Sequence, residues 1–152
     1  MDYKSILQKL KDSEYLVADI EEHEEGLDVM ATINKRLKLV PLIVEGELKG
    51  VTLFIPVSHT DDVHQLIDTT AQVLHTITTM TTTAVLIDAV TGCGTDRSAT
   101  IMTLLGMMSY GGIAKYKTRV IHVEGDFNIT RNSQQGMIII SIFRRASLDI
   151  TS

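Results

Sequence analysis

The sequence predicts an α/β fold: a mixed sheet with an N-terminal antiparallel meander followed by βαβαβ units, with helices packed on the sheet. Short apolar segments between glycine-bearing or charged turns over residues 15–57 indicate the meander. Beyond residue 58, helical patterns alternate with short apolar runs, which favours parallel pairing through helical crossovers. We expect a single domain over residues 1–152, because a chain of this length supports one core. Its two parts are residues 1–58 and 59–150.

The first part is expected to contain one helix and four strands. Residues 3–12 carry apolar side chains at helical spacing with lysines opposite, which predicts an amphipathic helix. The acidic run 21–26 is expected to be a turn. Pro41 has no N–H, so its strand is expected at a sheet edge or bulged at that point. The four strands are expected over residues 15–20, 27–33, 37–44 and 51–57.

The second part is expected to alternate helices with buried strands. Thr60 is a natural N-cap for a helix over 60–80, which a run of β-branched threonines is expected to fray near Met80. The same helix places His75 on a stripe opposite its apolar face, expected to be solvated. The other elements are expected as strands over 84–90, 119–123 and 137–143, a helix over 96–108 and a loop over 125–135.

Composition narrows the class of protein. The net charge of −5 and the dispersed basic residues argue against nucleic-acid binding. A single cysteine rules out an internal disulfide and fits a reducing compartment. No run reaches the ~18 apolar residues of a membrane helix, and the N-terminus does not resemble a signal peptide. A cytoplasmic protein is therefore expected, with no cofactor and no metal site.

The most informative stretch lies around residues 83–99, where an apolar run ending at Asp88 is expected to lead through a loop into a helix. Such a helix start offers unpaired N–H groups and positive potential. Two glycines allow a ligand to approach closely. The loop matches neither the dinucleotide-binding nor the phosphate-binding glycine pattern. The candidate binding residues are Thr91, Gly92, Cys93, Gly94, Thr95, Asp96, Arg97 and Ser98.

Three functions remain open at this loop, besides a plain capped turn that serves structure alone. A protein partner would contact Asp96, Arg97 and Ser98. A small anionic ligand or a lipid headgroup would use the same loop and helix start. A thiol enzyme would need Cys93 as nucleophile with a base nearby, for which His122 is the candidate.

From about residue 60 onward, the chain resembles the STAS family of sulfate-transporter and anti-sigma-factor-antagonist domains, including STAS/SEC14-like proteins. Val85-Leu86-Ile87-Asp88 matches the family strand, and Asp96-Arg97-Ser98-Ala99 falls on its Asp-Ser-Ser-Gly helix start. The glycines at 111–112, the strand at 119–123 and a closing strand after Gly136 continue the order. The serine that the family phosphorylates falls on Arg97, which departs from the pattern.

The resemblance implies a non-enzymatic regulatory module that binds a protein partner through the 91–98 loop and the following helix start. The alternatives are binding of a small anionic ligand or lipid headgroup at that loop, and a thiol enzyme based on Cys93. A homodimer is also expected, through the exposed edge of the N-terminal strands, because unpaired edges favour pairing.

Overall fold

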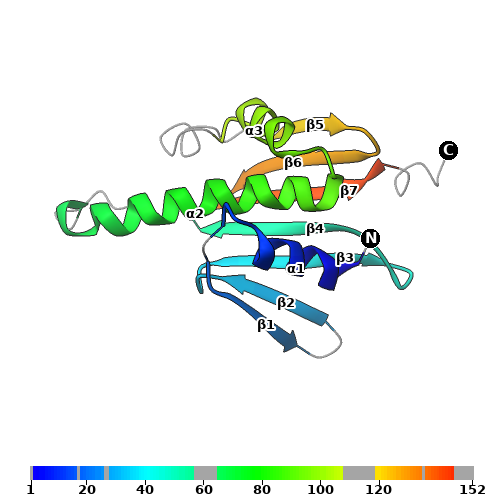
Figure 1. Ribbon diagram of the computed structural model, residues 1–152, viewed down its shortest axis with the longest axis horizontal. Coiled ribbons are helices and arrows are strands. Elements are labelled where there is room, and N and C mark those ends of the chain that lie inside the picture. Colours follow the sequence, from blue (N-terminus) through cyan, green and yellow to red (C-terminus); the bar gives the residue numbers. More distant parts are fainter. Residues whose placement is uncertain are drawn as a thin grey trace.

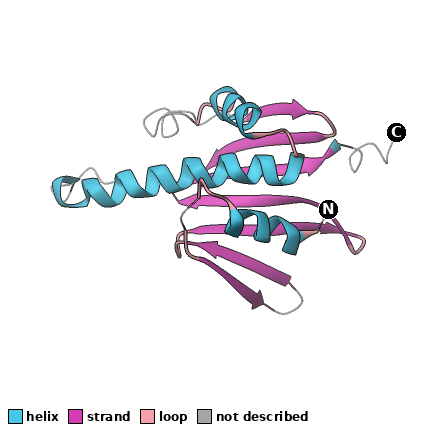
Figure 2. Cartoon of the chain, viewed as in Figure 1, coloured by secondary structure: helices cyan, strands magenta, loops and turns pink. Residues whose placement is uncertain are grey.

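In the part of the chain that the structure describes, a seven-stranded sheet carries three helices on one of its faces, which gives mixed α/β content (Figures 1 and 2). The computed structural model describes residues 2–16, 18–25, 28–56, 65–107, 119–134 and 136–145. The helices are α1 (Tyr3–Asp12), α2 (Gln65–Thr91) and α3 (Thr95–Leu104). The strands are β1 (Ile20–Glu25), β2 (Asp28–Ile33), β3 (Leu37–Val44), β4 (Glu47–Pro56), β5 (Val120–Glu124), β6 (Phe127–Gln134) and β7 (Met137–Arg144).

The strands lie in the order β1-β2-β3-β4-β7-β6-β5, and every pair is antiparallel. The expected N-terminal meander is confirmed by β1 to β4, except that its first strand lies over residues 20–25 and not over 15–20. The expected parallel βαβ pairing is wrong, because α2 and α3 carry the chain past β4 to the far edge of the sheet at β5. From there β6 and β7 return as a second meander. The β4–β7 pair joins the two parts of the chain in one sheet.

The largest correction concerns residues 84–90, which lie in α2 and not in a strand. Over residues 79–90 of α2, buried side chains recur at helical spacing, at Thr79, Thr82, Thr83, Leu86, Ile87 and Val90, with Ala89 buried beside them. The hydroxyl of Thr83 donates to the carbonyl of Thr79 at 2.7 Å, which satisfies a threonine inside the helix. Neither the expected fraying at Met80 nor the buried strand is found, since packing on the sheet overrides weak helix propensity. A continuous apolar run alone does not distinguish a buried helix from a strand.

Two further strands occupy segments that were expected to be irregular. The acidic run forms β1, in which Glu22 faces α1 and pairs with Lys11 at 3.1 Å. The expected loop at 125–135 is a turn followed by β6, whose alternation is hidden by the buried Arg131. Pro41 lies in an interior strand, and the register shift falls just beyond it, between Leu42 and Ile43.

The core fills the space between the helices and the covered face of the sheet. Ile6, Leu7 and Leu10 of α1 are fully buried there, as the periodicity of residues 3–12 predicts. The strands contribute Ala31, Ile33, Leu37, Leu39, Val51, Leu53, Ile55, Ile129, Ile138, Ile140 and Ile142. These strand residues alternate with half-exposed ones, so only one face of the sheet is covered.

Candidate functional site

The candidate loop joins two helices, α2 and α3, and not a strand and a helix as expected. The α2 helix ends at Thr91, whose hydroxyl donates a hydrogen bond to the carbonyl of Ile87 at 2.6 Å. Gly92 and Gly94 have φ angles of 70° and 94°, a backbone region that glycine adopts without strain. These glycines let the chain reverse within three residues, so α3 packs directly against α2.

The open N-terminus of α3 is occupied by a carboxylate from α2. The Oδ1 atom of Asp88 accepts a hydrogen bond from the N–H of Gly94 at 2.8 Å. Asp96 supplies a second negative charge in the first turn. Both carboxylates lie where the helix macrodipole favours an anion. The sequence places Asp88 at the end of a strand, whereas the structure makes it the group that holds the α2–α3 turn.

Arg97 is paired with β5. Its Nε and Nη2 atoms donate to the carboxylate of Glu124 at distances of 2.8–3.0 Å. The Nε2 atom of His122 lies 3.2 Å from the same carboxylate. Hydrogen bonding to Arg97 lowers the pKa of Glu124, with a smaller contribution from His122. This group therefore anchors α3 to the edge of the sheet.

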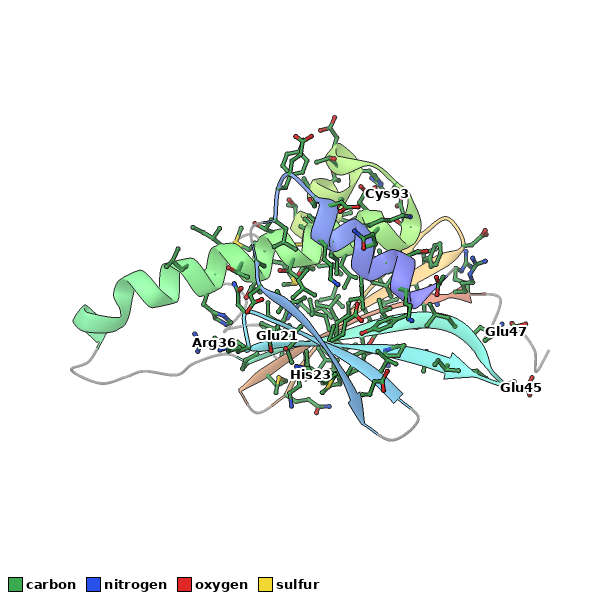
Figure 3. The ribbon with its side chains drawn as sticks, turned by 60° about the horizontal axis from the view of Figure 1, so that its bottom comes forward. Glu21, His23, Arg36, Glu45, Glu47 and Cys93 are labelled. Atoms are coloured by element: carbon green, nitrogen blue, oxygen red, sulfur yellow. The ribbon has the colours of Figure 1, made fainter. Side chains whose placement is uncertain are left out.

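Ser98 and Cys93 differ in accessibility. Ser98 is 1% exposed, and its hydroxyl donates to the backbone carbonyl of Ala84, so it joins α3 to α2. Cys93 is half-buried, and its Sγ atom lies 3.5 Å from the carbonyl of Gly94. Among the described hydrogen bonds none joins this thiol to a base, and His122 contacts Glu124. Figure 3 shows Cys93 on the helix side of the molecule, away from His23 on β1.

A groove of about 760 Å³ lies beside this loop, over the surface of α2. The α2 helix forms its floor, α3 forms one wall, and the end of α1 with residues 13–15 forms the other. The three helices lie side by side in Figure 1. The lining residues are Lys9, Asp12, Ser13, Glu14, Tyr15, Met80, Thr81, Ala84, Val85, Asp88, Ala89, Gly92, Thr95, Ser98, Ala99 and Met102.

The groove has an apolar floor and a charged rim. The groove is open because several of its lining residues are alanine or glycine, whose side chains are too small to fill it. One methionine from α2 and one from α3 lie at its sides. Lys9 is on the rim, and its Nζ atom donates to the carbonyl of Ala89 at 3.3 Å. The three carboxylates on the rim belong to Asp12, Glu14 and Asp88.

The groove includes only part of the predicted site. Gly92, Thr95 and Ser98 line it, whereas Arg97 is directed to Glu124. The residues that sequence reasoning missed come mainly from α1, residues 13–15 and α2, since the strand expectation for residues 84–90 concealed the side of α2 that lines the groove. Met80, Ala84 and Asp88 recur every four residues on this side of α2, and this spacing is the signal that could have identified them.

Other kinds of site find no support in the part of the chain that the structure describes. No three His, Cys, Asp or Glu side chains gather there to hold a metal ion. His75 is buried and not solvated, with its Nε2 atom 2.9 Å from the carbonyl of Pro56. Of the described helices, none has the length and apolar character needed to cross a membrane. Comparison with family models, curated proteins and solved structures found no match.

Proposed function

We propose that this chain is a non-enzymatic protein-binding module whose groove over α2 accepts an amphipathic helical segment of a partner. The observation that carries the proposal is the open apolar groove between α1 and α3, beside the 91–98 loop. Grooves of this kind accept the apolar face of a helix, whose anchors recur at helical spacing. The role agrees with what the STAS resemblance implies, but it depends on the groove and not on that resemblance.

The floor of the groove suits a helix. Ala84, Ala89 and Ala99 are small, so the backbone of a bound helix can approach α2 and α3 closely. Met80 and Met102 are flexible side chains that adapt to differently shaped anchors. Affinity would come from a few large apolar side chains that displace water from this floor.

The rim selects a partner with basic residues beside its apolar face. The rim carries more negative than positive charge, with carboxylates at Asp12, Glu14 and Asp88 and one ammonium group at Lys9. The ammonium group of Lys9 already contacts the carbonyl of Ala89. Complementary charge on the partner would raise the association rate and fix its orientation. The carboxylate of Asp88 at the start of α3 disfavours the alternative of an anionic ligand or lipid headgroup. The thiol-enzyme alternative has no base in described contact with Cys93.

Ala99 provides the sharpest test, because it is exposed and lines the groove. An Ala99→Arg variant fills the groove and repels a basic partner. The probe is a designed amphipathic helical peptide whose leucine face is flanked by lysines, and its affinity is measured by fluorescence anisotropy. We expect wild-type protein to bind it and Ala99→Arg to weaken binding at least about tenfold, or about 1.4 kcal/mol.

Thr103→Arg is the matched control, since Thr103 is exposed on α3 but does not line the groove. It should bind the peptide like the wild type. A peptide with glutamates in place of the lysines should bind more weakly. Equal affinity for both peptides, or an Ala99→Arg variant that binds normally, would contradict the proposal. Arg97→Glu is a poorer test, because the new carboxylate would also repel Glu124.

A further inference from the structure

The sheet face opposite the helices, here called the open face, carries an unusual number of apolar side chains. Cross-strand partners share a face, so the register assigns its members. Ile121, Val123 and Leu42 are 57%, 48% and 41% exposed. The remaining apolar members in the described strands are half-buried: Met30, Val40, Phe54, Pro56, Met137, Ile139 and Phe143. An antiparallel sheet that faces water normally alternates to polar residues on that side.

One half of the sheet consists of β5, β6, β7 and residues 50–56 of β4, and its charged side chains lie on the helix-covered face. Glu124 of β5, Arg131 of β6 and Arg144 of β7 all have the register of the helix-covered face. In the described strands, no Asp, Glu, Lys or Arg of β5, β6, β7 or residues 50–56 lies on the open face. A surface from which charge is removed and on which apolar groups gather is typical of an interface.

The open face is large enough for a stable interface. Strands about 4.8 Å apart that rise about 3.3 Å per residue give a seven-stranded face of roughly 700 Å². A stable protein–protein interface buries about 600–1,000 Å² on each partner. A partner that covers this sheet therefore has to cover most of it, as a second sheet does.

We propose that a second copy of this chain covers the open face, so that two sheets pack against each other about a two-fold axis. Each copy has a net charge of −5 and is repelled by another acidic surface. The uncharged half of the open face allows two acidic copies to come into contact without bringing like charges together. Because this half carries no charge, it does not attract an oppositely charged protein. The same apolar patch on both copies meets the self-complementarity that a two-fold interface needs.

The edge of β1, where a homodimer was expected from the sequence, is a poorer interface. Glu21, Glu22 and Glu24 lie along this edge strand. Pairing β1 with its symmetry mate would bring these carboxylates together on adjacent strands, which is destabilising. Acidic residues of this kind protect an edge strand from pairing.

The charges also favour one direction for the axis. The β4 strand is the fourth of seven, so it is the middle of the sheet. An axis along β4 places β5 of one copy over β1 of the other, and keeps Glu21 away from Glu21 of the partner subunit. By the strand register Ile121 then lies over His23 of the partner subunit, with Glu21 of the partner subunit two residues away on the same face of β1. An axis across the strands would stack β1 on β1 and oppose the like charges.

The test is sedimentation velocity of the full chain at mildly alkaline pH, where histidine is neutral. We expect the wild type to have twice the 16.8 kDa mass of one chain at micromolar concentrations. Ile121→Glu should raise the dissociation constant at least about tenfold. Ile121→Lys should raise it less, because the long lysine side chain reaches Glu21 of the partner subunit, whose carboxylate lies beside His23 in each chain. Ile121 is exposed, so neither variant disturbs the core.

Leu104→Glu is the matched control, because Leu104 is 53% exposed on α3, on the helix side. It should leave the dimer intact. A wild-type chain that stays monomeric would overturn the proposal, as would a dimer that Ile121→Glu leaves unchanged. Equal weakening by the two Ile121 variants would overturn the placement of the axis along β4. None of these outcomes depends on the groove over α2.

Discussion

Tyr3 fixes α1 to the sheet through a buried phenol. Its hydroxyl donates to the carbonyl of Leu39 at 2.6 Å, and the residue is 9% exposed. Burial disfavours the phenolate, which raises the pKa of Tyr3 from 10.0 to about 12. One polar atom on the inner face of an amphipathic helix thus makes the docking of α1 dependent on pH.

The raised pKa predicts a loss of stability in alkali. Below pH 10 the phenol is neutral in both states and its stabilising contribution is complete. This contribution is lost as the pH rises from 10 through about 12, and amounts to on the order of 2–3 kcal/mol. Urea unfolding across this range should show the loss in the wild type and a smaller one in Tyr3→Phe. Tyr15→Phe, at a 66% exposed position, should behave like the wild type.

At the scale of the element, α2 shows how far the sequence predicts the fold. The α1 helix follows its periodicity closely because it has one clearly apolar side, whereas β3 and β7 are apolar runs of a length typical of strands. Residues 84–90 are apolar on nearly all sides, so periodicity could not separate a strand from a helix that is packed between the sheet and two other helices. The acidic β1 is stabilised in part by Lys11, a tertiary contact outside the local pattern.

The candidate site was predicted in part for the same reason. The loop and its glycines were located correctly from the sequence, although Asp88 was given the wrong role. The groove is formed by one side of α2 together with the end of α1, and these segments are far apart in the sequence. Lys9 and Ala89, for example, are brought into contact only by the packing of α1 on α2.

We predict that the packing of α2 on the sheet weakens in acid, because His75 of α2 is buried against β4. Burial is the main cause of its lowered pKa, and the nearby charge of Arg36 lowers it further. As the pH falls below 6.5, the unfolded chain takes up a proton before the folded chain does, so the free energy of unfolding decreases. His75→Gln can keep the hydrogen bond to Pro56 and should lose this pH dependence. Equilibrium unfolding from neutral to acidic pH measures it.

Leu74→Gln is the control for this prediction, because Leu74 is 60% exposed on α2 beside His75 and does not titrate. Its unfolding profile should follow that of the wild type in the same acidic range. If His75→Gln kept the full acid dependence, the buried imidazole would not be its source.

At the scale of the whole molecule, the two sides of the sheet have separate uses. The helix side holds the core and a groove with an apolar floor and an acidic rim. The open face carries apolar residues and, on β5, β6, β7 and residues 50–56 of β4, no charge. A dimer formed through the open face would present two grooves on its outer surfaces. Such a dimer could bind a partner that carries two copies of the recognised helix more tightly than a single groove.

The central claim is that the groove over α2 binds an amphipathic helix with basic flanking residues. Its most direct test is a two-dimensional amide NMR titration of the full chain with the lysine-flanked peptide. We expect shifts to concentrate at Ala84, Ala99 and Met102 and their neighbours, with the amide signals of Thr52 and Ile121 unchanged. Shifts confined to the open face, or none at the groove at saturating peptide, would contradict the account.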